Sequence, residues 1–344
     1  MRQNLYNFTL QEITEIVQKI GAEKFRAKQI FDWLYKSKVK NIKEMKNLPL
    51  QLLEQLEAKY EIALPEIIKE TKSKLDGTTK YLLKLKDGAK IECVLLYDKE
   101  RITLCASTQV GCGCGCAFCS TGSIGFKRNL EPCEITGQFI LMQNITQNKI
   151  TNIVLMGMGE PFLNWENVNK AIIIISDKNG PNFSQTRITV STVGIIPVIK
   201  QIADSDLKIN LAISLICVDD EKRTKLMPVN KKYPVNEIIK IAKYYNKKSG
   251  KEITFEYILF KDINDSIKDA EEIIKKLKEI NFKINLIPYN NSLNKDFSKP
   301  EYEKILKFQK ILIDGGIKTY IRKEKGSDIK AACGQLAAES GEEK

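Results

Sequence analysis

The stretch Gly111-Cys-Gly-Cys-Gly-Cys-Ala-Phe-Cys-Ser-Thr-Gly122 decides what fold and chemistry we expect of this chain. Its cysteines Cys112, Cys116 and Cys119 have the spacing C-x3-C-x2-C, which places three thiols on one short loop. Thiolates are the usual protein ligands of iron–sulfur clusters, and a four-iron cubane held by only three of them keeps one iron open to a small molecule. The loop therefore predicts a [4Fe–4S] centre and favours a radical enzyme over a scaffold protein.

Cys114, inside the same loop, offers a possible fourth thiol. A zinc site is the structural alternative; it needs a fourth Cys or His, and the chain has no histidine. On an extended C-G-C-G-C backbone we expect Cys114 to point to the side opposite its neighbours. The loop glycines permit the turns with positive φ that a cluster loop needs. Phe118 is expected to shield the cluster or to lie near the ligand of its open iron.

Composition limits the class of protein. With 344 residues, 43% of them hydrophobic, the chain has room for one large domain and a smaller one. It contains no apolar run of membrane-spanning length and no secretory signal at its N-terminus, so we expect a cytoplasmic protein with no membrane partner. Nine cysteines in such a chain favour metal binding or redox chemistry over a disulfide framework. Without histidine, acid–base work falls to Cys, Glu, Asp, Lys or water.

The chain is basic, with a formal net charge of +12 and a sequence pI near 9.1. This balance indicates an anionic partner such as nucleic acid, although a lysine-rich composition inherited from an AT-rich genome would give the same charge. Candidate phosphate contacts are Arg26, Lys28, Lys127 and Arg128. The alternative is that they are ordinary surface residues that only aid solubility. A phosphate role predicts binding that weakens steeply with salt.

Periodicity divides the chain into four segments. Residues 1–75 show helical apolar spacing over 10–20, 25–35 and 49–60 and are expected to form an accessory domain that binds nucleic acid. Residues 76–100 change to short β-like runs around an Asp87-Gly88 turn, which indicates an antiparallel connector. Residues 101–325 alternate between apolar strands and helical stretches, and residues 326–344 form a C-terminal segment.

The alternation predicts an α/β fold in which helices cover a parallel sheet. The strand candidates are residues 152–156, 187–191, 209–214, 253–258, 282–287 and 317–321. Six units suggest a partial (β/α)6 barrel, and in barrels the chemistry lies at the C-terminal ends of the strands. The candidate residues described below fall at such ends.

The cysteine loop, with an aromatic residue before its last cysteine, resembles the radical S-adenosylmethionine (SAM) superfamily. The wider run from Cys105-Ala-Ser-Thr-Gln-Val-Gly-Cys112 to Leu130 closely resembles the bacterial dual-specificity adenine-C2 methyltransferases of 23S ribosomal RNA and tRNA (the RlmN group). The resemblance reaches from Phe25 to Ala337. It implies a radical-SAM partial barrel, a [4Fe–4S] cluster and SAM as cofactors, and an RNA-binding N-terminal domain. It also implies 23S rRNA and tRNA as partners, with an external one-electron donor and a disulfide reductant; we expect a monomer.

The run Met156-Gly-Met-Gly-Glu-Pro161 follows a strand candidate. Its glycines let the backbone approach a ligand, and Glu160 offers an acceptor for a ligand ammonium; a plain strand-to-helix turn is the alternative. The resemblance implies that this run binds the methionine end of SAM and that further positions contact the cosubstrate. These positions are Gly159, Glu160, Ser191, Ser214, Leu215, Ile216 and Asn290.

Two positions depart from the family pattern. Ile216 stands where members usually have His, and Asn291 stands where they have Pro, before a shortened loop over 292–298. Any hydrogen bond made by the histidine side chain is lost, whereas a main-chain contact would survive. Cosubstrate affinity is therefore the property that these departures affect most.

Cys333 lies in Ala331-Ala-Cys-Gly-Gln-Leu-Ala337, where a cysteine taken alone would be a small buried residue. The resemblance instead implies that Cys333 is methylated by a first SAM and that a second SAM yields the radical that activates this methyl group. It also implies that Glu92 accepts the proton from adenine C2. Cys105 would then release the RNA by forming a transient disulfide with Cys333. The remaining cysteines, expected only to pack, are Cys93, Cys133 and Cys217.

Two other functions stay open. The related C8-methylating branch, which confers ribosomal antibiotic resistance, shares this cysteine placement, but the Glu160-Pro161 pair and the overall match favour C2. A non-catalytic iron–sulfur or zinc RNA-binding protein would neither need Cys333 nor cleave SAM.

Overall fold

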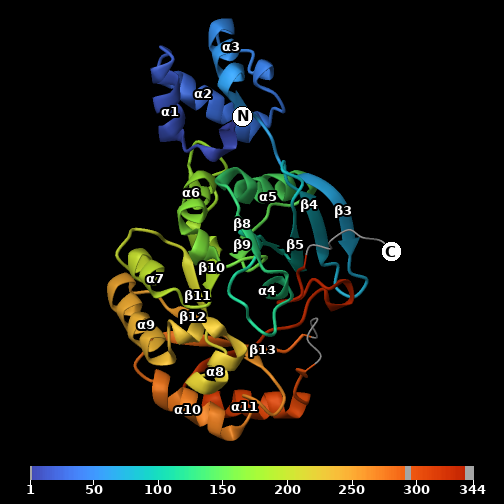
Figure 1. The fold of residues 1–344 in the computed structure, drawn as a ribbon, viewed down its shortest axis with the longest axis vertical. Coiled ribbons are helices and arrows are strands. Elements are labelled where there is room, and N and C mark those ends of the chain that lie inside the picture. Colours follow the sequence, from blue (N-terminus) through green and yellow to red (C-terminus); the bar gives the residue numbers. More distant parts are fainter. Residues whose placement is uncertain (1, 291–295, 338–344) are drawn as a thin grey trace.

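A computed structural model describes residues 2–290 and 296–337 (Figure 1). Its centre is a ten-stranded sheet in the order β14-β13-β12-β11-β10-β9-β6-β5-β4-β3. Helices pack on the sheet, and a separate group of helices stands at one end of the molecule. The mixed α/β fold and the partial barrel predicted from the sequence are both confirmed.

Seven neighbouring strands of this sheet run parallel. They are β6 (Arg101–Cys105), β9 (Asn152–Leu155), β10 (Ile188–Thr192), β11 (Asn210–Ser214), β12 (Ile253–Leu259), β13 (Phe282–Pro288) and β14 (Lys318–Ile321). The sequence pattern identified six of them, and the structure adds β6 as the first. Because the strands are parallel, their carboxyl ends meet at one edge, where the candidate residues gather.

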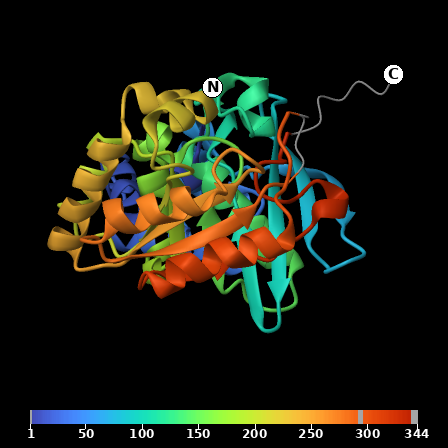
Figure 2. The ribbon, with the colours of Figure 1, turned by 90° about the horizontal axis from the view of Figure 1, so that it is seen from below.

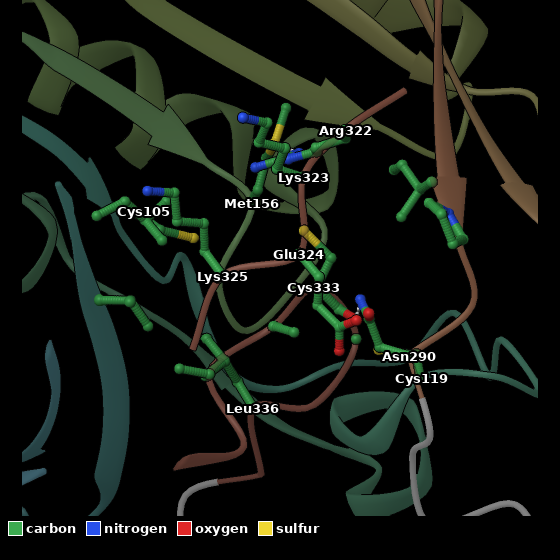
Figure 3. Close-up of a pocket in the computed structure, with 18 of the residues that line it drawn as sticks. Cys105, Cys119, Met156, Asn290, Arg322, Lys323, Glu324, Lys325, Cys333 and Leu336 are labelled. Atoms are coloured by element: carbon green, nitrogen blue, oxygen red, sulfur yellow. Dashed lines mark hydrogen bonds between the residues drawn. The ribbon is translucent and has the colours of Figure 1, made fainter. Parts of the chain in front are cut away.

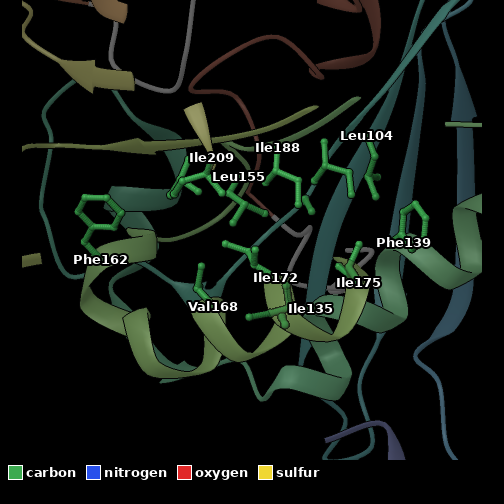
Figure 4. Packing of buried hydrophobic residues seen from close by; sticks show 14 of the residues in the cluster. Leu104, Ile135, Phe139, Leu155, Phe162, Val168, Ile172, Ile175, Ile188 and Ile209 are labelled. Atoms are coloured by element: carbon green, nitrogen blue, oxygen red, sulfur yellow. The ribbon is translucent and has the colours of Figure 1, made fainter. Parts of the chain in front are cut away.

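Helices cover the outer face of the parallel strands. They are α5 (Pro132–Ile145), α6 (Trp165–Ser176), α7 (Ile196–Ala203), α9 (Val235–Ser249), α10 (Ile267–Leu277) and α11 (Tyr302–Asp314). Figure 4 shows the resulting core, in which Leu155 and Ile188 of the sheet meet Ile172 of α6. The apolar stripe of each helix is buried on the sheet, and this burial is the main driving force for the fold.

Three antiparallel strands extend the same sheet beyond β6. They are β3 (Glu66–Lys72), β4 (Thr79–Lys84) and β5 (Lys90–Asp98). The β-like runs predicted as a connector are thus hydrogen-bonded to the barrel strands through β5 and β6. Strand β3 lies inside the segment predicted as helical. It was missed because its sequence, Glu-Ile-Ile-Lys-Glu-Thr-Lys, forms an exposed edge strand without an alternating apolar pattern.

The N-terminal segment contains α1 (Leu10–Lys19), α2 (Phe25–Asp32) and α3 (Leu50–Lys59), close to the predicted helices. Thr9 and Glu12 form a capping box that fixes the start of α1. The segment contacts the helical face of the barrel (Figure 1), where Lys170 of α6 pairs with Glu12 at 2.6 Å and the Cys133 N–H donates to Asn7 Oδ1 at 2.8 Å.

The last described residues return from β14 across the antiparallel strands (Figure 2). Asp328 accepts hydrogen bonds from Ser73 Oγ at 2.7 Å and from the Lys74 N–H at 3.0 Å. These bonds hold the start of the C-terminal segment against the turn between β3 and β4, and Thr121 Oγ1 donates to the Leu336 carbonyl at 2.6 Å further along the segment. Within the described ranges, no helix combines the length and hydropathy needed to cross a bilayer.

Candidate active site

The cysteine loop lies between β7 (Gln109–Gly111) and α4 (Ser120–Ile124), at the carboxyl edge of the sheet. Gly111 has φ +74°, and a Cβ there would lie 1.8 Å from the Gly125 carbonyl oxygen, so only glycine fits. Phe118 is buried beside the loop cysteines, with its ring 5.5 Å from that of Phe260. Phe118 therefore covers the loop, and its expected place beside a cluster or its ligand stays a prediction.

Cys112, Cys116 and Cys119 share this apolar enclosure. Burial, followed by the neighbouring thiols, raises the pKa of Cys116, and burial likewise raises the pKa of Cys119. Among the described residues, no three Cys, Asp or Glu side chains converge as ligands of a single metal ion. A cubane takes each thiolate on a different iron and does not require such convergence. Three thiols close enough to interact, in an apolar enclosure, fit a [4Fe–4S] cluster.

The predicted orientation of Cys114 is wrong. The thiols of Cys112 and Cys114 lie close enough to interact, and this interaction lowers the pKa of Cys112 and raises that of Cys114. Residues two apart on extended backbone lie on the same side, which is the opposite of what we expected. Cys114 is therefore a direct neighbour of the first predicted ligand.

The Gly-Met-Gly-Glu-Pro run forms a tight turn after β9. Gly159 has φ +102°, and a Cβ there would lie 2.5 Å from Gln109 Cβ. The Glu160 carboxylate accepts hydrogen bonds from the N–H groups of Phe162, at 3.0 Å, and Val193, at 2.9 Å. Burial raises the pKa of Glu160 to about 7. Glu160 thus links the turn after β9 to the end of β10 by hydrogen bonds. A cation that approaches Glu160 would stabilise its charged form.

Ser191 and Ser214 lie on the neighbouring strands β10 and β11, in the pairing where Ser191 faces Ala212. The next residues turn away from the strand, and Ile216 has φ +63°. A β-branched residue is strained in this left-handed region, by about 1–3 kcal/mol, whereas His and Asn adopt it more readily. Asn264 Nδ2 donates to the Ile216 carbonyl at 2.8 Å and holds the backbone in this conformation. The left-handed conformation therefore belongs to the position, at which the resembling family usually has His.

One cavity of about 100 Å³ brings together residues that are distant in the sequence (Figure 3). Cys105 lies at the end of β6 and Cys333 on the C-terminal segment, and both line this cavity with Cys119 of the cysteine loop. Asn290 also lines it and donates to the Cys333 carbonyl at 3.4 Å. Asn291 and the positions up to 295 lie outside the described residues. All nine cysteines are free thiols.

Arg322 is a cavity residue that sequence reasoning missed. It follows β14, and its guanidinium acts electrostatically on both Cys105 and Cys333. Burial raises the pKa of Cys105 to about 12, against the opposing effect of Arg322. An arginine near the end of a strand is too common a feature to have been singled out from sequence.

Glu92 lies outside this cavity. Its carboxylate is 2.9 Å from Lys80 Nζ and accepts the Ala337 N–H at 2.8 Å. On β5, however, Glu92 shares a face with Val94 and Leu96, which do line the cavity. The end of the C-terminal segment therefore covers the Glu92 carboxylate.

The remaining candidates are placed as follows. Cys93, Cys133 and Cys217 are buried, and burial raises the pKa of each thiol, consistent with packing roles. Arg128 is already engaged by Asp87 at 2.7 Å and Glu134 at 2.8 Å, which disfavours it as a phosphate contact. Arg26 donates to the Asn47 carbonyl at 3.0 Å, and Lys28 and Lys127 are exposed.

Two family models match the chain: the ribosomal RNA large subunit methyltransferase N-terminal domain over residues 3–62, and the radical SAM superfamily over residues 106–277. Curated relatives include a probable dual-specificity RNA methyltransferase RlmN of Thermotoga sp., 45% identical over 97% of both chains. One of the same description from Clostridium botulinum is 46% identical over 97% of this chain and 96% of the relative. A crystal structure of a radical SAM methyltransferase from Sphaerobacter thermophilus superposes with a TM-score of 0.92 at 38% identity, covering 98% of this chain and 100% of that one. The chain therefore belongs to the RlmN family of radical SAM methyltransferases.

Proposed function

We propose that this chain methylates C2 of an adenine in 23S rRNA, and of an adenine in tRNA, with Cys333 as the carrier of the transferred carbon. The proposal is carried by one observation: Cys105 and Cys333, remote in sequence, line the same cavity as Cys119 of the cluster loop. The names of the curated relatives support RNA as the substrate class.

The cysteine loop and the strand ends would hold the cofactors. Cys112, Cys116 and Cys119 would ligate a [4Fe–4S] cluster, and Gly159 and Glu160 would bind the methionine end of SAM. The further SAM contacts would be Ser191, Ser214, Leu215, Ile216 and Asn290. Bound together, the cluster and SAM supply one-electron chemistry that abstracts a hydrogen atom from an unactivated carbon.

Cys333 would act first as a nucleophile. Its thiolate attacks the methyl group of one SAM, so that a new sulfur–carbon bond forms as the donor's sulfonium–carbon bond breaks. A second SAM is consumed when this methyl group loses a hydrogen atom and is joined to adenine C2. The target adenine must be unstacked, because C2 is otherwise out of reach.

Glu92 and Cys105 would complete the reaction. Glu92 accepts the proton that leaves C2. The Cys105 thiolate attacks the Cys333 sulfur, so that the disulfide forms as the bond between Cys333 and the carbon on the RNA breaks, and this carbon takes up the proton held by Glu92 to become the methyl group. The electron that the external donor supplied to activate the second SAM is released again in this sequence. An external reductant then supplies two electrons and two protons to restore both thiols. In the described structure Ala337 contacts Glu92, so the base requires the end of the C-terminal segment to move.

The test is an anaerobic assay on the reconstituted protein with ribosomal RNA and tRNA substrates, followed by mass spectrometry of the digested RNA. We expect 2-methyladenosine; 8-methyladenosine alone would refute the C2 assignment. Cys333→Ala should keep the cluster and lose methyl transfer, whereas Cys105→Ala should accumulate a covalent protein–RNA adduct. Cys93→Ala removes a buried thiol on the other face of β5 and is the matched control. It should keep methyl transfer and accumulate no protein–RNA adduct.

A further inference from the structure

Arg223 is the largest fully buried side chain in the described part of the chain. It lies on α8 (Asp220–Leu226), a short helix in the connection from β11 to β12. Buried arginines normally pair with a carboxylate. No Asp or Glu among the described residues lies within ion-pair distance of this guanidinium; Asp220 reaches it only through Asn230, which bonds to both.

The partners of Arg223 are five neutral oxygen atoms. Nε donates to the Leu215 carbonyl at 2.9 Å, and Nη2 donates to the carbonyls of Val193 at 2.8 Å and Ser214 at 3.1 Å. Nη1 donates to Asn230 Oδ1 at 2.7 Å and to the Tyr233 carbonyl at 3.3 Å. One side chain therefore fixes the ends of both β10 and β11, where the proposed function places SAM contacts.

The same helix supports the cysteine loop. The Ala117 N–H donates to the Leu226 carbonyl at 2.9 Å. Burial lowers the pKa of Arg223 to about 10, and the Cys116 thiol is the strongest charge effect opposing that change. The guanidinium thus lies near a predicted cluster ligand, with its hydrogen bonds satisfied and its charge not neutralised.

A charge in this position has an electrostatic consequence. A cluster with three thiolate ligands carries more negative charge when it accepts an electron, and a fixed positive charge nearby favours the reduced form. Lys222, the preceding residue, does not serve this purpose, because it pairs with Asp269 at 2.6 Å. A neutral donor could make the hydrogen bonds of Arg223, but it could not supply the positive charge.

We propose that Arg223 is a positioning residue with an electrostatic role: it holds the SAM-binding ends of β10 and β11 and raises the reduction potential of the cluster bound beside it. The inference rests on the cluster and SAM sites of the proposed function. It needs no RNA, so failure of RNA methylation would leave it standing.

The test compares Arg223→Met, which removes charge and donors, with Arg223→Lys, which keeps the charge. Lys222→Met is the matched control on the same helix. Each protein is reconstituted anaerobically, and the cluster is titrated by electron paramagnetic resonance against electrode potential. We expect a more negative potential for Arg223→Met only. Its reduction by dithionite should be incomplete, whereas titanium(III) citrate should reduce it fully. An unchanged potential would overturn the electrostatic role.

SAM affinity tests the positioning role, by equilibrium binding to each reconstituted protein. Loss of a residue that orients a metal ligand typically costs about 10–100-fold in metal affinity or activity, and we expect a loss of SAM affinity of this order for both Arg223 variants and no change for Lys222→Met. Unchanged affinity in both variants would overturn the positioning role. If Arg223→Met fails to retain a cluster, Arg223→Gln takes its place in the titration. Retention of the cluster by Arg223→Lys but by neither neutral variant supports the electrostatic role. Failure of Arg223→Lys to retain the cluster as well refutes that role.

Discussion

Glu160 provides a direct test of the electrostatics of the site. The folded chain raises its pKa from 4.5 to about 7 through burial. The folded state therefore keeps this proton at pH values where the unfolded chain has lost it. The stabilisation is complete below pH 4.5 and is lost as the pH rises through about 7. Between pH 5 and pH 8 this one group should lower the free energy of unfolding by about 2.5 kcal/mol.

The change Glu160→Gln removes the titration. The amide stays neutral, but its NH2 group must face one of the two backbone N–H donors, Phe162 or Val193, at a cost of about 1–3 kcal/mol. We expect the variant to be less stable than the wild type at pH 5 and to recover relative to it by pH 8. For a chain of 344 residues, a change of 2.5 kcal/mol corresponds to about 3–4 °C in Tm.

The assay is the Tm of the cluster-free chain, measured by scanning fluorimetry under reducing, anaerobic conditions at intervals from pH 5 to pH 8. Exposed Glu166→Gln, on α6, is the chemically matched control and should follow the wild type. Parallel curves for the wild type and Glu160→Gln would refute the reasoning, because they would mean that Glu160 titrates alike in the folded and unfolded chain.

The same proton should be linked to cosubstrate binding. If Glu160 binds the SAM ammonium, its charged form is required, and binding should tighten as the pH rises through about 7. At pH 7, calorimetry in buffers of different ionisation heat should detect release of about half a proton per SAM bound. Affinity that is flat from pH 6 to pH 8 would contradict this role.

Three further changes test other parts of the site. Gly159→Ala would bring a Cβ within 2.5 Å of Gln109 Cβ at a backbone φ of +102°, so we expect a lower Tm and weaker SAM binding; wild-type affinity by equilibrium dialysis would contradict this. Lys80→Met removes the cation 2.9 Å from buried Glu92 and should lower stability by up to about 3 kcal/mol in a urea titration, and an unchanged midpoint would show that the pair contributes nothing. Thr121→Val removes the 2.6 Å hydrogen bond to the carbonyl of residue 336, and should cost about 1 kcal/mol and speed amide exchange over 326–337; exchange at the wild-type rate would indicate that the bond does not hold the C-terminal segment.

Local pattern was sufficient to predict six of the seven parallel strands and the N-terminal helices, because each buries an apolar face with its own period. It was not sufficient for β3, an exposed edge strand, nor for the joining of β5 to β6, which depends on long-range pairing. The expected orientation of Cys114 was wrong because residues two apart on an extended backbone lie on the same side.

The cysteine ligands and Cys333 were singled out by motif and resemblance, and their roles stay predictions. The cavity shared by Cys105 and Cys333 is a tertiary property that no local pattern contains. Arg223 shows the limit most clearly. It lies in Asp-Asp-Glu-Lys-Arg-Thr-Lys, which has the composition of a solvated helix, yet its side chain is fully buried.

The pairing of β5 with β6 has a consequence for how this family can tolerate insertions. Val94 lies opposite Cys105, and Glu92 lies two residues before Val94 on the same face. One residue inserted into β5 between Glu92 and Val94 would rotate the carboxylate to the opposite side of the sheet. Extra residues in the turn after Asp98 would leave this geometry intact. Length variation should therefore be accepted at the hairpin tip and rejected within the strand.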